Sequence, residues 1–191
     1  SVVGNWEREI QRFAPSLRSW VHHGTDRCKG DDFVRHVGSY DLVLTTYHLA
    51  ARDVDHLKTV PWSAIILDEA QNIKNLHANQ TVAVKSLTGE RRVALTGTPV
   101  ENRLLELWSI MDFLNPGYLG SQSAFTNRYS RPIEQEKNTE LIQELRSLIR
   151  PFLLRRMKTD KHVIDDLPEK MENRVYCTLT TEQATLYQAV V

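Results

Sequence analysis

An apolar run, Ala64-Ile65-Ile66-Leu67, ends directly in the polar sequence Asp68-Glu69-Ala70-Gln71. The β-branched and leucine side chains predict a buried strand, so the two carboxylates stand at the end of that strand. Burying one such charge without a metal or a partner costs several kcal/mol, and packing alone gives no reason for the pair. Acids in this position are typical of folds that hydrolyse nucleotides, where they hold Mg²⁺ and orient a water. The alternative is a solvated strand end followed by an acidic helix start.

A second polar element follows about one strand-and-helix unit later, at Leu95-Thr96-Gly97-Thr98-Pro99. Hydroxyl groups and a glycine after a strand lie where parallel sheets bind ligands, outside the carboxyl edge of the sheet. The alternative is an ordinary turn, with glycine for its conformational freedom and proline to start the next helix. Because the two elements follow successive strands, together they favour a ligand site.

Strand-like and helical patterns alternate through the first part of the chain. The segments with strand character are residues 17–22, 41–45, 64–67 and 92–95. The segments with helical character are a helix capped by Asn5, residues 31–37, a polar stretch before Pro61, residues 77–87 and residues 101–114. Short apolar strands that alternate with helices predict an α/β fold, with a parallel sheet that helices cover on both faces.

The pattern changes after Pro116, where polar helices take over. Residues 117–150 are expected to be helical, with one apolar face formed by Leu141, Ile142, Leu145, Leu148 and Ile149. A last strand is expected at residues 174–179. It leads into a helix whose first residues, Thr180-Thr181-Glu182-Gln183, are similar to a capping box. The α/β part is therefore expected to carry a helical C-terminal extension.

The composition is that of an ordinary globular domain, with 191 residues, 41% hydrophobic and 25% charged. Lys+Arg and Asp+Glu are equal at 24 each. The net charge therefore gives no sign of nucleic acid, although a local basic stripe can bind phosphates on a neutral protein. Cys28 and Cys177 lack metal-ligand spacing, and no apolar run reaches the roughly 18 to 20 residues of a membrane helix. We expect an intracellular protein without a membrane partner, in the cytoplasm of a microbe or a eukaryotic nucleus.

Two longer stretches carry a family resemblance. Residues 65–75, with the Asp-Glu-Ala-Gln box, and residues 94–102, with Thr96-Gly97-Thr98-Pro99, closely resemble motifs II and III of the SWI/SNF-type DNA translocases of helicase superfamily two. The similarity continues over nearly the whole chain: residues 5–10 (motif Ia), 41–47 (motif Ib), 107–116 (the helix after motif III), and 153–156 with 167–170 (the connection to the second motor lobe).

The resemblance implies the first RecA-like lobe of an ATP-driven motor that moves along duplex DNA. In such a motor Asp68 would bind Mg²⁺ through water, and Glu69 would orient or deprotonate the attacking water. Further residues would sense the nucleotide and couple hydrolysis to movement between lobes, namely Gln71, Thr96, Gly97 and Thr98. ATP and Mg²⁺ are the implied cofactors of the complete motor.

The resemblance also implies contacts with the DNA backbone. Thr45, Thr46 and Arg27 match positions where hydroxyl, amide and guanidinium groups hold phosphates without reading the sequence. The alternatives are plain β-propensity for the threonines and a solvated loop for Arg27. Arg155 and Arg156 are expected to make a salt bridge or a hinge contact, because the family's catalytic arginines belong to the second lobe. The implied partners are duplex DNA, the second motor lobe and a DNA-bound protein.

A complete motor needs the phosphate loop Gly-x-x-x-x-Gly-Lys-Ser/Thr, and no Gly-Lys pair occurs in this chain. We therefore expect a piece of a longer protein that is inactive alone and exposes apolar sheet edges where the phosphate-loop strand is missing. Residues 1–116 would be the partial first lobe with motifs Ia to III, and residues 117–170 a helical insertion and connection. Residues 171–191 would be a strand and helix leading towards an absent second lobe.

Two alternative functions remain: an RNA-directed helicase lobe of the same superfamily, and a non-enzymatic docking module that keeps the fold. The acid pair and the Thr-Gly-Thr sequence favour a motor, because a docking module has no use for them. The helix around Trp108 and the Leu-Arg-Arg sequence at residues 154–156 resemble the DNA translocases rather than the RNA helicases.

Overall fold

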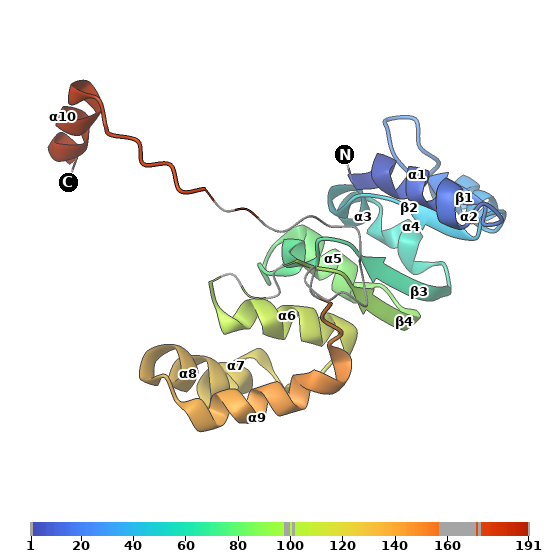
Figure 1. Ribbon diagram of the computed structural model, residues 1–191. Coiled ribbons are helices and arrows are strands. Elements are labelled where there is room, and N and C mark those ends of the chain that lie inside the picture. Colours follow the sequence, from blue (N-terminus) through green and yellow to red (C-terminus); the bar gives the residue numbers. More distant parts are fainter. Residues whose placement is uncertain (1, 98–99, 101, 157–170, 172, 191) are drawn as a thin grey trace. The chain divides into compact units, whose positions relative to one another are not determined.

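The computed structural model describes residues 2–97, 100, 102–156, 171 and 173–190 (Figure 1). The chain divides into two compact units, Ser1–Leu148 and Ile149–Val191. The described helices are all too short or too polar to span a membrane.

The first unit contains two pairs of parallel strands (Figure 1). Strand β1 (Ser19–Val21) pairs with β2 (Leu42–Leu44), and β3 (Trp62–Leu67) pairs with β4 (Gly89–Ala94). The helices that accompany them are α1 (Val2–Phe13), α2 (Gly30–Val37), α3 (Tyr47–Arg52), α4 (Val54–Lys58), the 3₁₀ turn η1 (Ala70–Ile73) and α5 (Asn79–Ser86). The α/β class and the parallel strands predicted from the sequence are confirmed. In the described part of the chain, no ladder joins β2 to β3, so the strands form two pairs rather than one continuous sheet.

One hydrophobic core holds the unit together, because the inward faces of β3 and of the surrounding helices are apolar. Its buried members are Phe33, Val37, Ala50, Leu57, Ile65, Leu67, Ala70, Ile73, Val84, Leu87, Ile110 and Phe113. Phe33, Ile73 and Phe113 are fully buried, and burying a side chain of this size stabilises the fold by about 1.5 to 3 kcal/mol. The core therefore holds β3 as far as Leu67, its last residue, and the polar residues begin directly after it.

The opposite face of β3 and β4 is not covered to the same extent. Ile66 and Val93 are register partners on the two strands, and they are 51% and 41% exposed. At these two residues the face is thus less covered than the helices on both faces predicted from the sequence would make it, and the predicted exposure of sheet edges stays a prediction.

Helices continue after the strands. Helix α6 (Leu104–Leu114) buries Trp108 and Met111, and it begins three residues later than the sequence suggested. It is followed by α7 (Gln122–Phe125), the π-helical turn η2 (Thr126–Ser130), α8 (Arg131–Glu136) and α9 (Thr139–Ile149). Arg128 and Tyr129 of η2 both donate hydrogen bonds to Glu144 of α9, at 2.7 and 2.6 Å, and so fasten the two elements together.

In the second unit, η3 (Arg150–Phe152) and α10 (Thr181–Val190) are the described helices. The strand expected at residues 174–179 is wrong: the described residues around it, 173–180, belong to no sheet. The capping box is confirmed, since Thr180 and Gln183 exchange side-chain to backbone hydrogen bonds of 3.1 and 3.3 Å. Arg155 and Arg156 are exposed, and their contact role stays a prediction. Residues 167–170 lie outside the described residues.

The helix expected to be capped by Asn5 begins earlier, at Val2. The Asn5 amide oxygen accepts a hydrogen bond from the Arg8 side chain within the helix, so Asn5 does not act as a cap. Strand β4 also begins earlier than expected, at Gly89. A Cβ on Gly89 would lie only 3.0 Å from Ile65 Cγ1, so the absence of a side chain lets the two strands approach.

Candidate functional site

The two acids stand at the carboxyl end of β3. Asp68 is half-buried and Glu69 is exposed. Each carboxylate oxygen of Asp68 accepts one hydrogen bond, Oδ1 from the Glu69 backbone N–H (2.9 Å) and Oδ2 from Trp6 Nε1 (2.8 Å). Because Trp6 comes from α1, a distant helix fixes the orientation of this carboxylate.

Tyr47, the first residue of α3, holds the main chain at the same point. Its hydroxyl donates a 2.8 Å hydrogen bond to the carbonyl oxygen of Asp68. Burial raises the pKa of the Tyr47 phenol, and the nearby charges of Asp68 and Glu69 raise it further. The phenol therefore keeps its proton at neutral pH and remains a donor.

Glu69 has a left-handed backbone, with φ 49° and ψ 53°. A non-glycine residue in this conformation costs on the order of 1 to 3 kcal/mol and persists only where its surroundings hold it. Two neighbours supply such bonds. Asn72 Nδ2 donates to the Glu69 carbonyl (2.9 Å), and Gln71 Nε2 donates to the Glu69 carboxylate (2.6 Å). The strained residue is thus also the one predicted to handle the attacking water.

Gln71 links the acid pair to the end of the neighbouring strand. Its amide oxygen accepts a 2.7 Å hydrogen bond from the Thr96 hydroxyl. The parallel register makes this possible, because Leu95 N–H donates to Leu67 C=O (2.8 Å) and Ala70 N–H donates to Leu95 C=O (2.9 Å). The structure therefore brings Gln71 and Thr96 together with the acids. Gly97 follows as an exposed residue, and Thr98 lies outside the described residues.

The donor chemistry of this site fits Mg²⁺. Mg²⁺ takes oxygen ligands, keeps several waters and needs only one or two carboxylates beside substrate phosphates. Asp68 offers an oriented carboxylate, and the lone pairs left on its oxygens can accept from metal-bound water. In the described part of the chain, no group of three or more His, Cys, Asp or Glu side chains gathers into an all-protein metal site. Among the described residues, the side chains around Asp68 would therefore suit Mg²⁺ only together with ligands from water or a bound phosphate.

The predicted DNA-backbone residues lie at the carboxyl ends of β1 and β2. Thr45 donates a 3.0 Å hydrogen bond to the carbonyl oxygen of His22. Thr46 is the N-cap of α3, and its hydroxyl oxygen accepts from Leu49 N–H at 3.2 Å. Both hydroxyls therefore have local structural roles as well, beyond the β-propensity considered as their alternative.

Arg27 is not in a solvated loop, because its side chain is only 4% exposed. It forms a two-pronged ion pair with Asp53, with Nε–Oδ2 at 2.5 Å and Nη2–Oδ1 at 2.8 Å. The remaining amino group donates to Gly24 C=O at 2.9 Å. The fully buried His22 ring contacts the same Asp53 carboxylate, with Nε2 at 3.0 Å from Oδ2. The hydrogen bonds from Arg27 and then His22 outweigh burial and lower the pKa of Asp53 to about 2.

A pocket of about 330 Å³ lies over this ion pair, and we call it the basic pocket. Its lining residues are His23, Gly24, Thr25, Arg27, Lys29, Thr46, His48, Leu49 and Arg52. Two of the three predicted DNA-backbone residues are among them. Since Asp53 neutralises Arg27, the exposed cations of the pocket are Lys29 and Arg52, which sequence reasoning did not single out.

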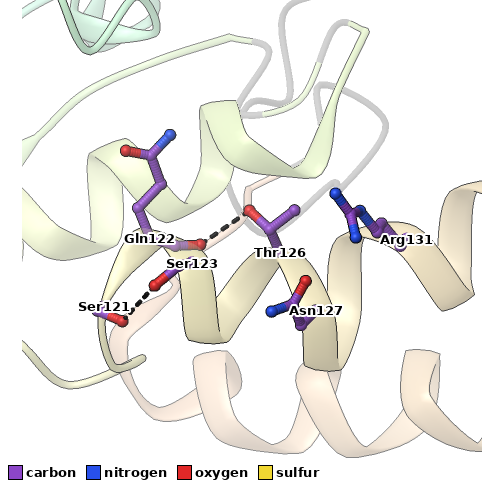
Figure 2. Close-up of a pocket in the computed structure, with 6 residues that line it drawn as sticks. All are labelled: Ser121, Gln122, Ser123, Thr126, Asn127 and Arg131. Carbon is purple, nitrogen blue, oxygen red and sulfur yellow. Dashed lines mark hydrogen bonds between the residues drawn. The ribbon is translucent and has the colours of Figure 1, made fainter.

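A second pocket, of about 650 Å³, lies far from the acids in the sequence (Figure 2). Serine, threonine and amide side chains line it together with Arg131, and Figure 2 shows Thr126 donating to the Gln122 carbonyl at 2.8 Å. None of the predicted site residues lines this pocket. Its hydroxyl groups largely satisfy each other or the local helix backbone, so it is not the candidate site.

Parallel strands with an oriented carboxylate pair and a hydroxyl-bearing turn at their carboxyl ends define an α/β domain of the nucleotide-hydrolase type. A sequence model of the SNF2-related domain matches residues 1–191. The chain belongs to the SNF2-related domain family.

Individual relatives agree with this assignment. The chain is 52% identical over 191 residues to YwqA of Bacillus subtilis, whose name describes an ATP-dependent helicase/translocase. It is 37% identical over 199 residues to the TATA-binding protein-associated factor mot1 of Schizosaccharomyces pombe. The alignments cover 100% and 97% of this chain, but only 21% and 10% of those two proteins.

A solved structure confirms the fold. The SWI2/SNF2 ATPase core of Sulfolobus solfataricus, in complex with double-stranded DNA, matches with a TM-score of 0.76 and 49% identity. The match covers 99% of this chain and 39% of that one. The family resemblance and the fold predicted from the sequence are therefore both confirmed.

Proposed function

We propose that this chain supplies the acid pair of the first motor lobe in an ATP-dependent DNA translocase. The observation that carries the proposal is the hydrogen-bonded series from Trp6 through Asp68, Glu69 and Gln71 to Thr96. It joins α1 and the ends of two parallel strands at one point. Five polar residues from three separate segments meet there, which a solvated strand end does not require.

Each residue of the series has a distinct role in this proposal. Asp68 holds Mg²⁺ through water, in an orientation set by Trp6. When bound, Mg²⁺ neutralises charge that develops on the phosphate oxygens. Glu69, exposed beside Asp68, orients the attacking water or accepts its proton. Gln71 joins Glu69 to Thr96, so a shift in one strand end reaches the other.

The second part of the proposal concerns Thr96, Gly97 and Thr98. These residues would couple hydrolysis to movement between the two motor lobes. The Thr96 bond to Gln71 supports a role for the first of them. The same coupling requires the second lobe as a partner.

The basic pocket is proposed to receive a phosphate of the DNA backbone. Thr46 and Arg27 line it, Thr45 stands beside it, and Lys29 and Arg52 add two exposed positive charges. Such groups bind phosphates without reading bases, and the affinity falls steeply with salt. The Sulfolobus solfataricus relative was solved with double-stranded DNA, which supports duplex DNA as the ligand.

The relatives bear on the alternative functions. They include an ATP-dependent helicase/translocase and TATA-binding protein-associated factors, which favours a DNA motor over an RNA helicase. The names of the latter also support a DNA-bound protein as the object that is moved. A docking module without activity does not explain the strained Glu69. We propose that the protein works inside the cell, because that is where a DNA motor finds its DNA.

The test is the steady-state ATP hydrolysis of the full-length protein with duplex DNA, with RNA and without nucleic acid. We expect stimulation by duplex DNA and a loss of at least about 100-fold in Glu69→Gln, because removing an acid–base group costs this much or more. Glu90→Gln, a change at an exposed glutamate of β4, is the matched control and retains turnover. Equal stimulation by RNA contradicts the DNA assignment, and full turnover in Glu69→Gln contradicts the role of the acid.

A further inference from the structure

Helix α3 lies between the basic pocket and the acid pair. Its N-cap Thr46 and its residues His48, Leu49 and Arg52 line the pocket. Its first residue, Tyr47, reaches the other way and donates to the carbonyl oxygen of Asp68 at 2.8 Å. One short helix thus contacts both proposed sites, although Tyr47 and Asp68 are 21 positions apart in the sequence.

Both ends of α3 are fixed by specific bonds. At the C-terminal end, Asp53 donates its N–H to Leu49 C=O (2.9 Å), and its carboxylate binds Arg27 and His22. At the N-terminal end, the Thr46 hydroxyl accepts from Leu49 N–H, and the Tyr47 hydroxyl binds the Asp68 carbonyl. These bonds connect the side of the pocket, through one short helix, to the Tyr47 hydroxyl.

The carbonyl oxygen of Asp68, which Tyr47 binds, is linked to the backbone torsion angles of Glu69. The Asp68 carbonyl oxygen belongs to the peptide group that joins Asp68 to Glu69. Rotation of that group changes ψ of Asp68 and φ of Glu69 together, and φ of Glu69 has the strained value of 49°. The Tyr47 bond to the Asp68 carbonyl is one of the few bonds that hold this strained torsion.

We propose that Tyr47 is a positioning residue that transmits occupancy of the basic pocket to the acid pair, by holding the peptide group between Asp68 and Glu69. The pocket's ligand in this proposal is a phosphate of the DNA backbone, so the inference rests on the proposed function. A ligand shifts an equilibrium only if it binds one arrangement better than the other. The cation of Arg52 on α3 supplies that difference, because it meets the phosphate only when the helix is in place.

The test uses the Tyr47→Phe variant of the full-length protein, which removes the hydroxyl and keeps the ring. Duplex-DNA affinity is measured by fluorescence anisotropy at fixed salt, and ATP turnover is measured with and without saturating duplex DNA. We expect the ratio of stimulated to basal turnover to fall about tenfold, a usual size for coupling between sites, with duplex-DNA affinity within about twofold of wild type. Tyr118→Phe is the matched control, because it removes a tyrosine hydrogen bond to the main-chain oxygen of Leu148 (3.1 Å).

A second variant changes a residue of the basic pocket and leaves the hydrophobic core intact. Arg52→Gln changes an exposed residue, and at saturating duplex DNA it lowers the same ratio. In the Tyr47→Phe background it lowers the ratio no further, because the transmission is already broken. If Tyr47→Phe or Arg52→Gln keeps the wild-type ratio of stimulated to basal turnover, the inference is overturned. The inference is also overturned if the double variant loses as much of this ratio as the two single variants together.

The outcomes separate this inference from the proposed function. If wild-type turnover does not respond to duplex DNA, or Glu69→Gln remains active, the proposed function itself fails. If wild type responds and Glu69→Gln is inactive while Tyr47→Phe keeps its full response, only the role of Tyr47 fails. A proportional loss of DNA affinity in Tyr47→Phe also overturns it, because the residue then serves binding alone.

Discussion

At the carboxyl ends of β3 and β4 the polar side chains are acidic or neutral and reach towards the surface, and one of them has a strained backbone. At the carboxyl ends of β1 and β2 the strongest charges, Arg27 and Asp53, are buried and neutralise each other. The first region keeps an exposed carboxylate on a strained backbone, at a cost in stability. The second uses its charges to hold a pocket in shape. Two strand pairs of the same kind therefore differ in where their charges lie, at or near the surface in one and buried as an ion pair in the other.

The largest effect that tests this division is expected from Asp53→Asn. The variant leaves Arg27 buried without its counter-charge, and breaking a buried pair in this way is strongly destabilising. We expect the Tm to fall by roughly 5 to 10 °C in a thermal melt followed by circular dichroism. The control is Asp41→Asn, which breaks a similar two-pronged pair with Arg18 whose side chains are 64% and 39% exposed. If the Tm falls equally in Asp53→Asn and Asp41→Asn, the difference between the buried and the surface ion pair is contradicted.

The same carboxylate gives a pH dependence of known sign. The pKa of Asp53 is lowered to about 2 in the folded protein, against roughly 3.9 in an unfolded chain. Its contribution to stability is therefore complete above about pH 4, and it is lost as the pH falls through about 2. Denaturant titrations at pH 6 and pH 3 measure it. The wild type loses more stability than Asp53→Asn over this interval, and parallel losses contradict the assignment.

An intermediate effect is expected from Trp6→Phe at the acidic region. The variant removes the indole N–H that binds Asp68 Oδ2 at 2.8 Å and keeps an aromatic ring. Groups that orient a metal ligand are worth about 10-fold or more in metal affinity, so the Mg²⁺ concentration for half-maximal ATP hydrolysis rises by about tenfold. Trp62→Phe, which removes an indole bond to Leu57 C=O of the same length, leaves that concentration unchanged. An unaltered Mg²⁺ requirement in Trp6→Phe shows that Trp6 only packs.

The smallest effect concerns the strain at Glu69. Glu69→Gly relieves a left-handed backbone, and the gain is partly offset by the greater freedom of glycine in the unfolded chain. We expect stability in urea to stay equal or rise by up to about 1 kcal/mol, while ATP turnover is lost. Lys137→Gly, at the other described non-glycine residue with positive φ, has a similar effect on stability and keeps turnover. A clear loss of stability in Glu69→Gly alone would show that its side chain supports the fold.

The sequence predicted the features that local patterns determine. The predicted strand segments overlap the four strands in the described part of the chain, and the carboxylates after Leu67 pointed to the acid pair. Parallel order placed Thr96 near that pair, and the register of β3 and β4 bears this out. These features were accessible because each depends on residues that are neighbours in the chain or in adjacent strands.

The contacts between distant segments could not be predicted in the same way. Trp6 and Asp68 are 62 positions apart, and Arg27 and Asp53 are 26 apart, with no periodic pattern that connects them. The sequence therefore predicted Arg27 as a DNA-backbone contact, with a solvated loop as the alternative, and gave no sign that its side chain is buried. The strand expected at residues 174–179 shows the reverse error, because β-propensity does not supply a neighbouring strand to pair with.

The exposed pair of Ile66 and Val93 has a consequence for the chain in solution. An apolar stripe beside open strand edges is a surface on which two molecules can join. Collisions between molecules follow second-order kinetics, whereas unfolding is unimolecular. Any loss of protein through this surface therefore grows with its concentration, and a partner that covers Ile66 and Val93 slows it.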